Sequence, residues 1–148
     1  ANTYGSRDLD DNHIIPYIIN CIIDNRDMKI SKEPFDYFRT FLNNHDSARA
    51  CVEIMEHGRS GVAYNVGSQE EVSIYELIKT ILFIAEDQYG ITYSGNIYKV
   101  IDRPGDPRRR VLDTTRLYED TGFKPEVSLE DGIVEMFNAV IDKRSRKN

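Results

Sequence analysis

The sequence predicts an α/β domain in which a few short strands pack with about five helices. Five stretches carry apolar residues at helical spacing, and short β-branched or aromatic segments lie between them. Strands that alternate with helices in this way are typical of α/β domains. Residues 1–148 contain no internal repeat and no low-complexity linker, so we expect them to form one domain.

The first helix is expected over residues 13–25, where isoleucines recur at four-residue spacing in two rows. Pro16 falls in its first turn, where a missing N–H costs little. Residues 28–31 and 37–42 have the aromatic and β-branched content of two short strands around a turn at Pro34.

A second helix is expected over residues 46–57, with Gly58 as its C-terminal cap. Its apolar face holds Ala48, Cys51, Val52 and Met55. A strand should follow at 62–67. The Ser-x-x-Glu capping box of Ser73 and Glu76 then predicts a third helix. The apolar face of that helix holds Ile74, Leu77, Ile78, Ile81, Leu82 and Ala85.

The last third of the chain begins with an expected strand near 98–101 and a Pro-Gly turn at 103–107. A short helix at 115–120 should end before a glycine. The final helix is capped by Ser128, and its apolar face holds Leu129, Ile133, Met136, Phe137, Val140 and Ile141. We expect the basic tail, 143–148, to be frayed.

The composition argues against several kinds of partner. A net charge of −6 gives no general affinity for nucleic acid or anionic lipid, because that binding needs clustered positive charge. No stretch approaches the roughly 20 apolar residues of a membrane span, and no signal-peptide pattern opens the chain. We therefore expect a cytoplasmic protein. Cys21 and Cys51 lie in apolar helical stripes and are expected to be buried thiols, and the three scattered histidines indicate no metal site.

The segment 101–113, IDRPGDPRRRVLD, places four arginines around a Pro-Gly turn in an acidic protein. Forked guanidinium groups suit phosphate oxygens, which they can bind two at a time. The same residues could instead form a solvated loop with surface ion pairs. Composition alone leaves both interpretations open.

Five pieces of sequence together resemble one family. They are Asn-Thr-Tyr-Gly at 2–5, Arg-Thr-Phe-Leu at 39–42 ahead of Asp-Ser-Ala-Arg-Ala at 46–50, Tyr-Asn-Val-Gly at 64–67, Arg-Pro-Gly-Asp at 103–106, and Thr-Gly-Phe-Lys-Pro at 121–125. In this order they resemble extended short-chain dehydrogenases that act on nucleotide sugars, most closely the dTDP-glucose 4,6-dehydratase group. The resemblance covers nearly the whole chain and corresponds to the C-terminal, substrate-binding portion of such an enzyme.

The resemblance implies a substrate-binding site made of Asn2 and Arg103 at the diphosphate, Arg39 at nucleotide or phosphate, Asp106 near the ribose, and Arg108 as a further arginine of the loop. Two structural alternatives stay open. Asn2 could be a turn residue that satisfies its own backbone, and Arg39 could pair with Asp46. The chain also departs from the family: Ser6 stands where a proline usually follows Tyr-Gly, and a usual Gly-x-Gly turn is replaced at 33–35.

The catalytic parts of the family are not found in these residues. Tyr75 and Lys79 match the Tyr-x-x-x-Lys spacing, but they follow the 64–67 piece, whereas the family's pair precedes Asn-x-Tyr-Gly. The glycines at 58 and 61 follow a helix, whereas a dinucleotide-binding turn follows a strand. We therefore expect no catalytic residue and no cofactor bound by this chain, with NAD held by a longer parent enzyme.

The function implied is to bind the nucleotide diphosphate of a nucleotide sugar for an NAD-dependent 4,6-dehydratase or epimerase. The start at Ala1, without methionine, suggests a fragment whose Rossmann half is absent. A UDP-glucuronate decarboxylase-like fragment and a non-catalytic nucleotide-binding or interaction module are alternatives. Strand edges near Tyr4 and Tyr64, with the helix of Ile14, Ile18 and Ile22, should lead to self-association as a homodimer or by segment exchange.

Overall fold

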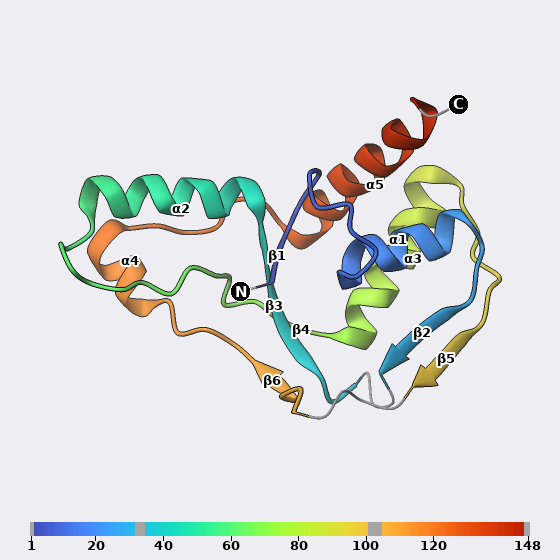
Figure 1. Ribbon diagram of the computed structural model, residues 1–148, viewed down its shortest axis with the longest axis horizontal. Coiled ribbons are helices and arrows are strands. Elements are labelled where there is room, and N and C mark those ends of the chain that lie inside the picture. Colours follow the sequence, from blue (N-terminus) through green and yellow to red (C-terminus); the bar gives the residue numbers. More distant parts are fainter. Residues whose placement is uncertain (1, 32–34, 101–104, 147–148) are drawn as a thin grey trace.

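The protein is described by a computed structural model that covers residues 2–31, 35–100 and 105–146. Those residues form five helices and six short strands, which confirms the predicted α/β class (Figure 1). None of the described helices combines the length and apolar character that crossing a membrane requires.

Strand β3 (Phe38–Asn43) is the centre of the larger sheet. Strand β1 (Asn2–Tyr4) runs parallel to its second half, with Asn2 opposite Phe41. Its first half lies between β4 (Glu71–Ser73), which is antiparallel, and β6 (Arg109–Arg110), which is parallel. A separate parallel pair joins β2 (Met28–Ser31) to β5 (Ile97–Val100). The first half of β3 is therefore paired with two strands, and its second half with β1.

Three helices enclose the main core: α1 (Ile14–Ile23), α3 (Ile74–Tyr89) and α5 (Leu129–Ser145). They gather on one side of β3, whereas α2 (Asn44–His57) and α4 (Thr115–Thr121) lie on the other (Figure 1). The core residues include Ile15, Ile18, Ile19, Ile22, Leu77, Ile81, Ile133 and Phe137. These four isoleucines of α1 are thus covered within the chain, and Ile14 and Ile23 pack partly against the same core, so α1 does not offer the open apolar surface expected for self-association.

Local signals place the helix ends as predicted. Ser73 and Glu76 form the full capping box at the start of α3, and the Ser128 hydroxyl accepts from the amide of Asp131 in α5. Gly122 ends α4 at φ +72°, a left-handed conformation that glycine adopts without a steric penalty. Helix α2 begins two residues before the predicted start, because the Asn43 side chain accepts from the amide of His45.

The buried face of α2 differs from the prediction. Ala48, Cys51, Val52 and Met55 are all exposed, and Met55 is 84% exposed. Asp46 and Ala50 are buried instead, and Ala50 packs in a small second core with Leu117 and Phe123. The Asp46 carboxylate accepts from the amides of Glu126 and Val127, which turns this face inward. Cys21 is buried as expected, but the expectation for Cys51 is wrong.

Two further expectations are corrected. Residues 62–67 form no strand, and side-chain hydrogen bonds hold the segment in place. The Tyr64 hydroxyl donates to Asp120, and the Asn65 amide donates to the carbonyl of Asp113. At the other end of the chain, α5 continues through Ser145, and Arg144 pairs with Asp24 of the connection after α1. The described start of the basic tail is therefore helical and anchored.

Candidate ligand-binding cleft

A cleft of about 1000 Å³ lies between the end of β1, the first turn of α1, β3 and the loop before β6. Its lining includes Asn2, Arg39 and Asp106, three of the residues predicted to bind substrate. The β1–β3 register explains how two of them meet. Asn2 lies opposite Phe41, and Arg39 projects from the same face as Phe41 because alternate residues of a strand share a face.

Arg39 is the best-anchored cation of the cleft. Its side chain is 9% exposed, and Nη2 donates to Oδ1 of Asp106 at 2.8 Å. Nη1 donates to the carbonyls of Phe38 at 2.9 Å and Arg108 at 3.2 Å. The guanidinium also lies 5.6 Å from the ring centre of Tyr37, within cation–π range. The carboxylate partner of Arg39 is Asp106. The alternative of an Arg39–Asp46 pair is therefore wrong, and Asp46 pairs with Arg49.

Asp106 joins two arginines at one end of the cleft. It follows Gly105, whose φ of +84° turns the loop back toward β3. Oδ1 of Asp106, which accepts from Arg39, also lies 3.5 Å from Nη2 of Arg110. The carboxylate thus serves as counter-ion for a buried and an exposed guanidinium. The resemblance implies a place for Asp106 near the ribose and does not predict these two ion pairs.

The three consecutive arginines have different surroundings. Arg108 is 72% exposed, lies 3.6 Å from Asp36 and does not line the cleft. Arg109 makes two hydrogen bonds to Glu71 of β4. Arg110 lines the cleft. The surface ion-pair interpretation therefore describes Arg108 and Arg109, and sequence reasoning missed Arg110, which the alternation of a short strand could have identified.

Asn2 and Arg103 complete the predicted set. Nδ2 of Asn2 donates to the carbonyl of Thr40 at 3.4 Å, so its side chain rests on the neighbouring strand at the cleft wall. Arg103 lies outside the described residues. Of the five predicted positions, the structure thus brings together Asn2, Arg39 and Asp106.

The loop after β1 and the start of α1 also contribute to the cleft. Asp8, Asp11, His13, Tyr17 and Lys29 line it. Nδ1 of His13 lies 2.7 Å from Oδ1 of Asp8, and this hydrogen bond, with the charge of Asp8, raises the pKa of His13 above its usual value. Asp11 accepts from Arg26 at 2.9 Å. This part of the lining is polar, and two of its carboxylates have cationic partners.

Ser6, which replaces the family's usual proline, anchors the loop after β1. Its hydroxyl donates to Oε1 of Glu135 in α5 at 2.5 Å, while Oε2 of the same carboxylate accepts from Asn43 at 3.1 Å. The Asp8–His13 loop is thereby fastened to α5 as well as to β3.

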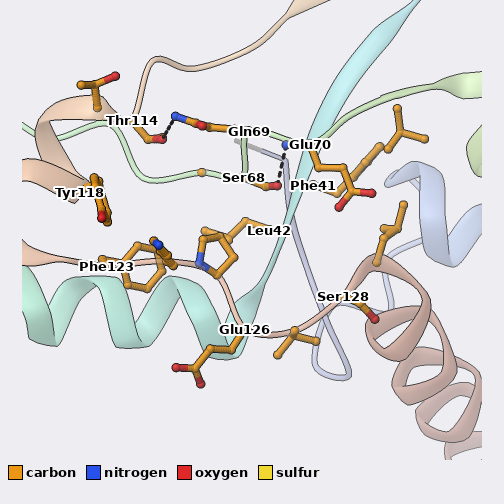
Figure 2. A pocket seen from close by; sticks show the side chains of 17 residues that line it. Phe41, Leu42, Ser68, Gln69, Glu70, Thr114, Tyr118, Phe123, Glu126 and Ser128 are labelled. Atoms are coloured by element: carbon orange, nitrogen blue, oxygen red, sulfur yellow. Dashed lines mark hydrogen bonds between the residues drawn. The ribbon is translucent and has the colours of Figure 1, made fainter.

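A second pocket of about 630 Å³ lies on the α2 and α4 side of β3 (Figure 2). Its lining mixes apolar side chains such as Phe41, Leu42 and Phe123 with polar ones, and Gln69 donates to Thr114 at 3.0 Å within it. Of the predicted site residues that the structure describes, Asn2, Arg39, Asp106 and Arg108, none lines it.

Tyr75 and Lys79 lie away from both cavities. The Tyr75 ring is exposed on α3, stacks on Phe35 at 4.1 Å between ring centres, and has Lys79 Nζ 5.7 Å away. This environment is consistent with a surface cluster. In the part of the chain that the structure describes, no group of three or more His, Cys, Asp or Glu side chains could hold a metal ion.

The chain is thus a small α/β domain in which Asn2, at the start of the Asn-x-Tyr-Gly piece, lines the same cleft as the Arg39–Asp106 pair. A family model described as GDP-mannose 4,6 dehydratase matches residues 1–136. The chain therefore belongs to this nucleotide-sugar epimerase and dehydratase family of extended short-chain dehydrogenases.

Individual relatives agree with the family. The chain is 30% identical over 133 residues to a dTDP-glucose 4,6-dehydratase of Streptomyces griseus. The aligned residues make up 90% of this chain and 38% of the relative. Its fold is similar to a dTDP-glucose 4,6-dehydratase of Streptomyces venezuelae solved with NAD bound, at a TM-score of 0.82 and 25% identity. That match covers 98% of this chain and 43% of the other.

A second solved structure, RMD of Pseudomonas aeruginosa complexed with NADPH, gives a TM-score of 0.81 and 26% identity. It covers 96% of this chain and 46% of that one. The chain thus spans less than half the length of the relatives it matches.

Proposed function

We propose that this chain binds the nucleotide diphosphate of a nucleotide sugar, on behalf of an NAD-dependent 4,6-dehydratase or epimerase. The observation that carries the proposal is the buried Arg39 guanidinium, held at the cleft wall by Asp106 and two carbonyl oxygens. A guanidinium with a fixed orientation suits phosphate oxygens because its forked donors bind them with defined geometry.

The cleft also has suitable dimensions and polarity. Its volume of about 1000 Å³ is at the upper end of the usual range for small-molecule pockets. The amide of Asn2 and the cations Arg39 and Arg110 lie among its lining residues, and the apolar residues Ile30, Phe41 and Ile74 contribute to the walls. Polar groups that converge within apolar walls are typical of sites that hold a nucleotide in one orientation.

The contribution of these residues to catalysis would be positional. A diphosphate held at Arg39 and Asn2 would orient the attached sugar toward groups supplied by the remainder of a longer protein, which lowers the entropic cost of reaction. NAD, when bound to such a protein, supplies hydride acceptance and return at the sugar. We assign no residue of this chain to NAD and none to proton transfer.

The test is calorimetric titration of the chain with dTDP and UDP, each compared with its nucleoside. Arg39→Gln and Arg103→Ala should each weaken diphosphate binding about tenfold or more, the size expected for losing a charge-assisted hydrogen bond. Arg116→Gln is the matched control, because Arg116 donates to the carbonyl of Ala63 and does not line the cleft. Equal affinity for nucleoside and diphosphate would reject the proposal.

We also propose that the chain self-associates, but through α2 in place of α1. Val52 and Met55 are 50% and 84% exposed and share the apolar face of α2 with Ala48 and Cys51. Contiguous exposed apolar side chains favour association with a second protein surface. The cytoplasmic location expected from the sequence stays a prediction.

A further inference from the structure

Arg110 faces the same side of the sheet as Arg39. Strand β6 pairs in parallel with β3, so that Arg110 lies opposite Arg39 and Arg109 lies opposite Phe38. Successive residues of a strand point to opposite faces. Arg109 accordingly reaches Glu71 of β4, whereas Arg110 lines the cleft.

The charges at this end of the cleft do not balance among the described residues. One carboxylate, Asp106, faces two guanidinium groups, and Arg39 is the closer of the two at 2.8 Å against 3.5 Å for Arg110. Arg39 also has two carbonyl acceptors, while the Arg110 side chain is 52% exposed. The other carboxylates of the lining, Asp8 and Asp11, pair with His13 and Arg26. Arg39 and Arg110 therefore share a single carboxylate counter-ion, which leaves a net positive charge among these three groups.

We propose that Arg110 is a further phosphate-binding residue of this cleft, and that Arg39 and Arg110 contact neighbouring phosphoryl groups of a nucleoside diphosphate. The inference rests on the proposed function. Both guanidinium groups approach the same Asp106 oxygen, so they are close enough together to contact one diphosphate. Asp106 holds the two cations side by side, and its own charge keeps their mutual repulsion low.

The arrangement predicts selectivity for a diphosphate over a monophosphate. A monophosphate can pair with Arg39, which is buried and fixed, while Arg110 gains a partner when a second phosphoryl group is present. Arg110 thus becomes a specificity-determining residue for the number of phosphoryl groups, and its loss should affect the two ligand classes differently.

The experiment is titration calorimetry of the 148-residue chain with UDP, UMP, dTDP and dTMP. Arg110→Gln should lower diphosphate affinity about tenfold and monophosphate affinity less than about threefold, and Arg110→Lys should restore part of the difference. Arg109→Gln is the control, because Arg109 is the residue next to Arg110 in the chain, but its side chain pairs with Glu71 and does not line the cleft. Thermal melts of all variants establish that each is folded.

The outcomes separate this inference from the function on which it rests. If the unaltered chain binds UDP and dTDP no better than their nucleosides, both are wrong. If it prefers diphosphates and Arg110→Gln keeps that preference, or weakens mono- and diphosphates equally, only the role of Arg110 is overturned. A selective loss of diphosphate affinity in Arg110→Gln, with Arg109→Gln unchanged, supports it.

Discussion

Arg39 of β3 donates to Asp106 at 2.8 Å across 67 residues of sequence. The pair joins the central strand to the loop before β6, and both residues line the larger cleft. Arg39 is 7% exposed as a whole residue, so its charge depends on Asp106 and on nearby carbonyls for compensation. One ion pair thereby contributes both to folding and to the geometry of the site.

Replacing Arg39 should destabilise the fold as well as weaken ligand binding. Arg39→Ala removes the donor to Asp106 and to the carbonyl oxygens of Phe38 and Arg108, and we expect a loss of about 2–4 kcal/mol in the free energy of unfolding. Urea denaturation measures it. Arg108→Ala is the control, since an exposed pair at 3.6 Å from Asp36 should change stability by less than about 0.5 kcal/mol. Equal stabilities of the two variants would contradict a structural role for Arg39.

The buried carboxylate of Asp46 should be a strong determinant of stability. It is fully buried and accepts from Arg49 at 2.6 Å and from the amides of Glu126 and Val127 at 2.9 Å. Asp46→Ala leaves these donors without their acceptor, and we expect a cost of about 3–5 kcal/mol in chemical denaturation.

Glu56→Ala on the exposed side of α2 is the matched control and should change stability by less than about 0.5 kcal/mol. An Asp46→Ala variant as stable as this control would show that α2 is held to residues 126–127 by packing alone.

The Asp8–His13 pair should make stability depend on pH. Because Asp8 raises the pKa of His13 in the folded protein, protonated His13 stabilises the fold at pH values below its unfolded pKa of about 6.5. This contribution is lost as the pH rises through the higher folded pKa. Asp8→Asn should therefore destabilise the protein more near pH 5.5 than near pH 9 in urea melts.

Asp87→Asn, at an exposed position of α3, controls for the loss of a negative charge. An NMR titration should also show the pKa of His13 falling toward its usual value in Asp8→Asn. If that pKa does not move, the 2.7 Å contact is not maintained in solution.

Self-association, if it uses the apolar face of α2, should be abolished by charges placed there. We expect the double change Val52→Asp and Met55→Glu to lower the mass measured by light scattering at micromolar concentration, because it disrupts an exposed apolar patch. Phe83→Asp is the control, since Phe83 is 67% exposed but lies on α3. A monomer at all concentrations before any substitution would show that the chain does not self-associate.

Signals local in sequence determined much of this protein. The capping box of Ser73 and Glu76, the Ser128 cap and the isoleucine spacing of α1 predicted helices correctly, because caps and helical periodicity act over a few residues. The order of the motifs likewise predicted the family. It also predicted that Asn2, Arg39 and Asp106 belong to one site, and the structure places all three in the lining of the same cleft.

Tertiary structure decided the features that depend on distant partners. The sequence pattern could not reveal that Asp46 would turn inward and leave Val52 and Met55 exposed, since the amides that bind Asp46 lie some 80 residues away. Nor could it separate Arg108, Arg109 and Arg110, because their directions follow from how β6 pairs with β3. Periodicity identifies which residues can share a face, but the choice of buried face and ion-pair partner depends on which segments pack against it.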